Sequence, residues 1–213
     1  MELLLFLPIL LLSVVVHEVA HAWQARREGD DTAYRLGRIT LNPISHLDPV
    51  GSFLVPLVLW FTSGGLLFGW AKPVPVNPAN YRDYRGGDIR VSLAGIVSNV
   101  ILAVLFTVVA AGLAPVAGTP GVFSTLFAMA RIGIFINLIL AFFNLIPIPP
   151  LDGSHVLYHL LPPGVRNRYR ETGRYGLGII MLLVFFVPGA FSVLLWPVNY
   201  LMSLANDFIG LWT

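Results

Sequence analysis

Residues 3–23 read LLLFLPILLLSVVVHEVAHAW, a run in which only Ser13, His17, Glu18 and His21 are polar. With a rise of 1.5 Å per residue, a helix over this run is about 30 Å long, which matches the hydrocarbon core of a bilayer. Residues 2–16 contain no Lys or Arg, so the basic leading region of a cleaved signal peptide is missing. We therefore expect a membrane-spanning helix here.

The composition of the whole chain agrees with a membrane protein. Apolar residues make up 56% of the 213 residues and charged residues 11%, and the mean hydropathy is +0.78. Soluble domains carry about 25% charged residues, so this chain cannot cover a water-facing surface. A soluble cytosolic enzyme and a nucleic-acid-binding protein are poor fits, and the lipid bilayer is the expected partner. Without cysteine there is no disulfide, thiolate metal site or cysteine nucleophile.

Four further apolar runs predict membrane helices. They cover residues 89–113, 124–146, 175–187 and 191–212. With residues 3–23 they predict an all-α polytopic membrane protein with about five transmembrane helices. Residues 50–68 are also apolar but are interrupted by Pro and Gly. In residues 34–41 apolar and polar side chains alternate imperfectly, which weakly predicts a short β element. Residues 71–78 carry three prolines and are expected to be extended.

The ionisable residues of the first run form the motif His17-Glu18-Val19-Ala20-His21. On a helix, positions i and i+4 share one face, so both imidazoles can bind one zinc ion. Glu18 lies about 100° round the helix, where its carboxylate can reach a water molecule beside the metal. Charged or titratable groups are costly inside a bilayer and are functional candidates there. The motif therefore predicts a metal centre with a general base.

A catalytic zinc ion usually has three protein ligands, so a third ligand is required. Asp152 is the candidate, because it follows the prolines that end the run 124–146 and hold the next residues extended. The alternative is that Asp152 simply caps a short helix over residues 153–161, but the need for a third ligand favours the metal. A second arrangement is a separate site made by Asp152, His155 and His159, which share a helix face. The role of His46 stays open.

The paired motifs resemble the site-2 protease family of intramembrane zinc metalloproteases. The resemblance rests on residues 17–21, on residues 144–153 (NLIPIPPLDG) and on Gly95 and Asn99, which match the family's Gly-x-x-x-Asn pattern. It covers about residues 1–160, which we treat as the protease core, with residues 161–213 as C-terminal transmembrane helices. It implies one zinc ion per chain, held by His17, His21 and Asp152. It also implies Glu18 as catalytic acid/base and a supporting role for Asn144 near the substrate backbone.

One zinc ion shared by the first helix and Asp152 constrains the topology. The helices over 3–23 and 124–146 must run in the same direction, so only one of the two runs between them can cross the membrane. The basic residues flanking residues 50–68 on both sides place both loops in the cytoplasm. Residues 50–68 are then re-entrant or interfacial, the N-terminus is outside, and the zinc site lies nearer the cytoplasmic face, in the plasma membrane.

The expected activity is hydrolysis of peptide bonds in or near transmembrane segments of membrane proteins. Glu18 would take the proton of the attacking water and return it to the leaving amine. Two alternatives remain. Intramembrane histidines and carboxylates also suit a metal or proton transporter, and an inactive homologue would bind transmembrane segments without cutting them.

Overall fold

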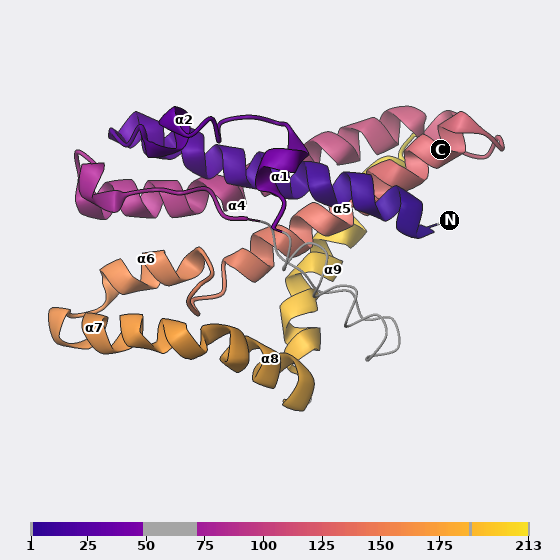
Figure 1. Ribbon diagram of the computed structural model, residues 1–213. Coiled ribbons are helices and arrows are strands. Elements are labelled where there is room, and N and C mark those ends of the chain that lie inside the picture. Colours follow the sequence, from indigo (N-terminus) through magenta and orange to yellow (C-terminus); the bar gives the residue numbers. More distant parts are fainter. Residues whose placement is uncertain (1, 49–71, 188, 213) are drawn as a thin grey trace.

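The computed structural model describes residues 2–48, 72–187 and 189–212, and these form helices joined by turns and extended segments (Figure 1). Within those ranges there is no β-strand. The longer helices are α1 (Glu2–Glu28), α4 (Tyr84–Leu113), α5 (Val122–Asn144), α6 (Gly153–Leu160), α7 (Pro163–Glu171), α8 (Gly176–Phe186) and α9 (Ala190–Gly210). The shorter ones are α2 (Thr32–Arg35), η1 (Pro43–His46), η3 (Pro78–Asn80), η4 (Ala114–Val116) and η5 (Thr172–Tyr175).

Three helices of the described ranges are long and apolar enough to cross a membrane, and they cover Leu5–Glu28, Tyr84–Val116 and Val122–Asn144. The expected all-helical membrane protein is confirmed at this level. The count of about five crossings is not confirmed, because neither α8 nor α9 is among these candidate spans. Helix α8 has only 11 residues, which span about 16 Å at 1.5 Å per residue. The predicted re-entrant segment, residues 50–68, lies outside the described ranges.

The core forms where α4 packs along α1 and α5, with α9 against α5 (Figure 1). Small side chains dominate the helix contacts, which lets the backbones approach closely as membrane helices do. One cluster joins α4, α5 and α9 and contains Ala103, Ala110, Ala111, Ala114, Ala130, Ile134, Leu138, Val198, Ala205 and Ile209. Helix α9, near the C-terminus, therefore shares one core with α4 and α5.

The outer face of α4 is apolar and exposed. Its exposed large side chains are Val97, Val100, Ile101, Val104, Leu105, Val108 and Val109. Soluble monomers rarely expose continuous apolar patches of this extent. Such a face suits contact with lipid, in agreement with the composition.

The short β element expected at residues 34–41 is wrong. Helix α2 and a turn occupy this region, and Gly37 adopts a left-handed conformation with φ of 65°. The local cause is Asp30, whose Oδ1 accepts hydrogen bonds from the Thr32 backbone N–H at 3.2 Å and the Thr32 hydroxyl at 2.5 Å. These bonds start a helical turn, which an alternation of apolar residues does not reveal.

Residues 72–77, which we name the strap, are extended as the prolines predict, and Val74 packs against Ala22 of α1. At the start of the strap, the Lys72 N–H donates a hydrogen bond to His46 O at 2.8 Å. The Arg38 guanidinium donates to Lys72 O at 3.0 Å. At the other end, the Asn77 N–H donates to Asp30 Oδ2 at 2.6 Å. Both ends of the strap are thus held by residues that follow α1.

Asp30 predicts a pH-dependent stability of the strap. Its carboxylate is fully buried; burial raises its pKa, but hydrogen bonds from Thr32, Asn77 and Asn80 outweigh burial and leave the pKa below 3.8. A lowered native pKa stabilises the fold above the unfolded value, and this contribution is lost as the pH falls through the native pKa. We expect Asp30→Asn to cost about 1–3 kcal/mol at neutral pH.

Thermal unfolding of the purified protein as a function of pH measures this effect. The difference between wild type and Asp30→Asn should shrink as the pH falls below 3.8. Asp31→Asn is the matched control, because Asp31 is half exposed and pairs with Arg26 at 3.3 Å on the surface, which contributes about 0–1 kcal/mol. Equal effects of the two variants on stability would contradict the stabilising role of the buried Asp30 carboxylate.

Candidate metal centre

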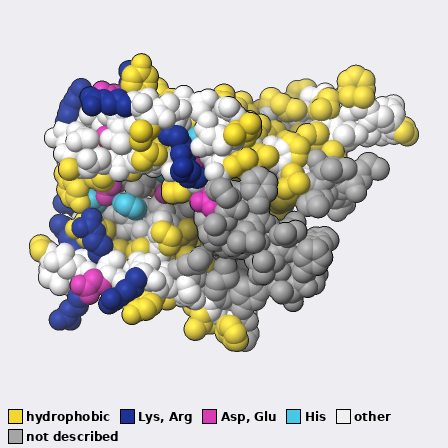
Figure 2. Space-filling view, in the orientation of Figure 1, with side chains coloured by type: hydrophobic (Ala, Val, Ile, Leu, Met, Phe, Trp, Pro, Cys, Tyr) yellow, Lys and Arg dark blue, Asp and Glu magenta, His cyan; other side chains and the backbone are white. Residues whose placement is uncertain are grey.

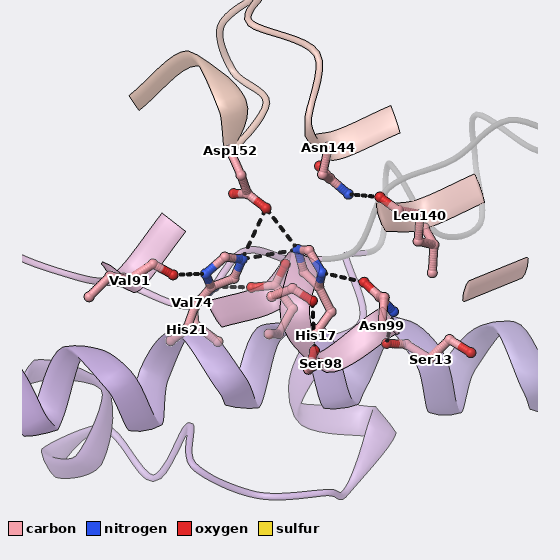
Figure 3. Close-up of polar contacts among 12 residues, drawn as sticks. Ser13, His17, His21, Val74, Val91, Ser98, Asn99, Leu140, Asn144 and Asp152 are labelled. Atoms are coloured by element: carbon pink, nitrogen blue, oxygen red, sulfur yellow. Dashed lines mark hydrogen bonds and ion pairs between the residues drawn. The ribbon is translucent and has the colours of Figure 1, made fainter. Parts of the chain in front are cut away.

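His17 and His21 lie one turn apart on the same face of α1 (Figure 3). Their Nε2 atoms are 2.9 Å apart. The side chain of His17 is 9% exposed and that of His21 is 12% exposed. The spacing in the sequence therefore brings the two rings together inside the protein, as expected.

Asp152 reaches the same point from the start of α6. Its Oδ2 lies 3.2 Å from His17 Nε2 and 3.3 Å from His21 Nε2. Asp152 occupies the N-cap position of α6, but its side chain makes no capping hydrogen bond. The carboxylate points at the imidazoles instead (Figure 3). Gly153 permits this approach, because a Cβ there would lie 3.0 Å from Ile146 O and closer still to Leu145 O.

The second ring nitrogens show which atoms of the cluster are free to bind a cation. His21 Nδ1 lies 2.7 Å from Val91 O, and His17 Nδ1 lies 2.6 Å from Asn99 Oδ1. A carbonyl oxygen can only accept, so each Nδ1 carries the hydrogen and each Nε2 presents a lone pair. Hydrogen bonds of this kind orient metal-binding histidines.

Three lone-pair-bearing atoms therefore meet without a proton between them. Within the described residues, the buried Asp152 Oδ2 has no hydrogen-bond donor. Donor atoms of a tetrahedral zinc site, with bonds of about 2.0–2.2 Å, are separated by roughly 3.3 Å. The observed separations of 2.9, 3.2 and 3.3 Å are close to this value. The cluster fits a zinc ion, and no other group of three such residues converges in this way in the described part of the chain.

Gly95 of α4 gives the imidazoles their space. A Cβ at this position would lie 2.5 Å from His17 Cε1 and 2.7 Å from His17 Nδ1, and closer still to His21 Nε2. We expect Gly95→Ala to displace both rings and to weaken zinc binding about 10- to 100-fold, as changes around metal ligands do. Competition with a chelator measures the affinity.

Gly112→Ala is the matched control on the same helix, because nothing lies within 4 Å of a Cβ there. It should leave zinc affinity unchanged. The variant should also fold, because alanine is a better helix former than glycine. Unchanged affinity in Gly95→Ala would contradict the packing argument.

Glu18 faces the strap. Its Oε2 accepts a hydrogen bond from the Val74 backbone N–H at 2.7 Å. The strap is tied down at both ends, so this donor is fixed in space and holds one carboxylate oxygen. The contact is absent from any local sequence pattern, because 56 positions separate the two residues.

Asn144 lies at the end of α5, where it is half-buried. Its Nδ2 donates to Leu140 O of the same helix at 3.0 Å. In Figure 3 this side chain is turned toward its own helix. The structure therefore does not bring its amide into the polar contacts of the cluster.

The remaining histidines have other partners. His155 Nδ1 and His159 Nε2 lie 3.2 and 2.8 Å from Asp88 Oδ2 of α4, so they do not form a site with Asp152. His46 is buried, and its Nε2 lies 2.9 Å from Thr40 O. Sequence reasoning did not identify Asp88, which anchors α6 on α4 next to Asp152. The sequence offered one indication of a role for Asp88, which is its position in the first turns of an apolar helix.

The chain is similar over most of its length to proteins named as putative zinc metalloproteases. The model of peptidase family M50 matches residues 111–187. A protein named "Putative zinc metalloprotease YwhC" from Bacillus subtilis is 44% identical over 194 residues, which cover 88% of this chain and 82% of YwhC. Rip2 of Mycolicibacterium smegmatis is 32% identical, covering 82% of this chain and 64% of Rip2.

Rip2 of Mycobacterium tuberculosis is 29% identical, covering 84% of this chain and 65% of that protein. No solved structure matches significantly. The resemblance inferred from the motifs is confirmed by these comparisons. On the strength of the long match to YwhC and of the family model, this chain belongs to peptidase family M50, the site-2 protease family of intramembrane zinc metalloproteases.

Proposed function

We propose that His17, His21 and Asp152 hold the single zinc ion of this protease and that Glu18 is its catalytic base. The observation that carries the proposal is the convergence of three lone-pair-bearing atoms, two from α1 and one from the start of α6. Both imidazoles are oriented by hydrogen bonds at Nδ1, as is usual for zinc-binding histidines.

When bound, zinc supplies a Lewis acid that polarises the scissile carbonyl and activates water. Glu18 takes the proton of the attacking water and later delivers it to the leaving amine nitrogen. The Val74 N–H holds Glu18 Oε2, which orients the other carboxylate oxygen. For Asn144 we propose a supporting role at the substrate backbone, for which its amide exchanges Leu140 O for a substrate carbonyl.

The substrates we propose are transmembrane segments of other membrane proteins. A helical segment shields its carbonyls in hydrogen bonds, so it must unwind locally before Glu18 and the cluster can act. We place the catalytic core in residues 1–160 and treat residues 161–213 as C-terminal transmembrane helices.

The orientation we propose has the N-terminus outside the cell and the metal cluster nearer the cytoplasmic face of the plasma membrane. Lys and Arg side chains gather at one end of the molecule, near the end of α1, the start of α4 and α7 (Figure 2). Arg26, Arg27, Arg85 and Arg168 belong to these elements. The positive-inside rule assigns this end to the cytoplasm. The chain lacks cysteine, so single cysteines near Arg35 and Arg82 should both be labelled from the cytoplasmic side.

A cleavage assay on reconstituted protein, with zinc analysis of wild type and His17→Ala, tests the proposal. We expect about one zinc ion per wild-type chain, cleavage of a model transmembrane substrate that a chelator stops, and loss of zinc in His17→Ala. Metal or proton flux without cleavage would favour a transporter. Zinc binding and substrate binding without cleavage would identify an inactive homologue. Full zinc occupancy in His17→Ala would refute the ligand assignment.

A further inference from the structure

Three polar side chains outside the proposed ligand set lie buried among the membrane helices. Ser13 of α1, Asn99 of α4 and Asn137 of α5 are each 0% exposed. Each belongs to a different one of the three candidate membrane spans. Burying an amide in an apolar environment is costly unless its hydrogen bonds are made, so their partners are informative. We name these residues the polar chain.

The hydrogen bonds of the polar chain have a fixed direction. Ser13 Oγ donates to Ile9 O at 2.8 Å. Asn137 Nδ2 donates to Ser13 Oγ and to Gly133 O, both at 2.8 Å. Because the backbone carbonyls of Ile9 and Gly133 can only accept, the amide nitrogen of Asn137 must face this side. Its Oδ1 therefore faces α4.

The order of donors and acceptors continues in the same sense from Asn137 to the metal cluster. Asn137 Oδ1 accepts from Asn99 Nδ2 at 2.8 Å. Asn99 Oδ1 is thereby turned to the other side, where it lies 2.6 Å from His17 Nδ1. An oxygen at this place requires a hydrogen on Nδ1, and the neutral ring then has its lone pair on Nε2. That is the atom that faces His21 and Asp152.

We propose that Asn99 and Asn137 are positioning residues that hold His17 in the Nδ1–H form, with Nε2 aimed at the metal. The inference rests on the proposed function, in which His17 is a ligand. Asn137 acts through Asn99, two hydrogen bonds away from the imidazole. His21 needs no such chain, because a backbone carbonyl, Val91 O, fixes its ring directly.

A purely structural role for the polar chain predicts a different result. Hydrogen bonds between membrane helices contribute modestly to stability on average. Loss of such a bond would lower stability and leave the affinity of the folded protein for zinc unchanged. A positioning role requires that zinc affinity and the tautomer of His17 depend on the direction of the chain.

The test uses three variants of the full chain, purified in detergent. Asn137→Leu removes the amide, whereas Asn137→Asp, protonated in this buried place, can still donate from its hydroxyl and accept at its carbonyl. Ser98→Ala is the control, because Ser98 adjoins Asn99 but donates only to Gly95 O of its own helix, at 2.7 Å. Chelator competition measures zinc affinity, and ¹⁵N spectra of metal-free protein, with its five histidines, report the tautomers.

We expect Asn137→Leu to weaken zinc binding about 10- to 100-fold, Asn137→Asp to recover most of the loss, and Ser98→Ala to match wild type. In metal-free wild type, His17 should be the Nδ1–H form, although free imidazole in water favours the other tautomer. Wild-type affinity in folded Asn137→Leu would overturn the inference. If Asn137→Leu fails to fold, the wild-type spectrum decides, and an Nε2–H ring at His17 overturns it.

His17→Ala in the same series separates this inference from the proposed function. Loss of zinc in His17→Ala with full affinity in Asn137→Leu would overturn only the positioning role. Undiminished zinc binding in His17→Ala would overturn the proposed function as well.

Discussion

Glu18→Gln should abolish cleavage while the protein keeps its zinc. The glutamine side chain preserves the shape of Glu18 and still offers an oxygen to the Val74 N–H, which now bonds Oε2 at 2.7 Å. It cannot accept a proton from water. Loss of a general base costs about 10²–10⁴-fold, so kcat/KM for a model transmembrane substrate should fall by that amount. Zinc analysis of the same sample should give the wild-type content, because the three proposed ligands are untouched.

Glu171→Gln is the matched control for this substitution. Glu171 ends α7 and is exposed, so the same chemical change there should leave cleavage and zinc content at wild-type values. A normal cleavage rate in Glu18→Gln would remove Glu18 as the base. Loss of zinc together with loss of cleavage would instead indicate that Glu18 supports the cluster.

The sequence could predict those parts of the site whose residues are close together along the chain. His17 and His21 are four positions apart, and helical geometry alone brings them together. The prolines before Asp152 indicated where a helix must stop, so a third ligand at that point was a reasonable expectation. The meeting of Asp152 with the imidazoles is a tertiary contact, and only the requirement for a third zinc ligand suggested it.

The parts that could not be predicted depend on partners far away in the chain. Asn137 lies in an apolar run and is therefore a functional candidate, but nothing local reveals that it bonds Ser13, 124 positions earlier. The contact of Asp88 with His159, 71 positions later, is equally hidden. The predicted strand at residues 34–41 failed for the opposite reason, because a local bond from Thr32 to Asp30 outweighed the apolar alternation.

Asp152→Asn separates the two roles that the position of Asp152 allows. Asparagine is as good an N-cap as aspartate, so a residue that only caps α6 would tolerate the change. A ligand would lose its negative charge and one oxygen donor. We expect zinc affinity to fall by more than about 100-fold, beyond the range typical of residues that act only through a ligand. Cleavage should fall with it at limiting zinc.

Asp83→Asn provides the matched control, because Asp83 is a true N-cap. Its Oδ1 accepts from the Gly86 N–H at 3.1 Å at the start of α4. This variant should keep zinc affinity and cleavage at wild-type values. The side chain of Asp152 makes no such capping bond, and its Oδ2 instead lies 3.2 Å from His17 Nε2. Equal zinc affinity in Asp152→Asn and wild type would therefore return Asp152 to the helix cap and leave the two imidazoles to find a third ligand elsewhere.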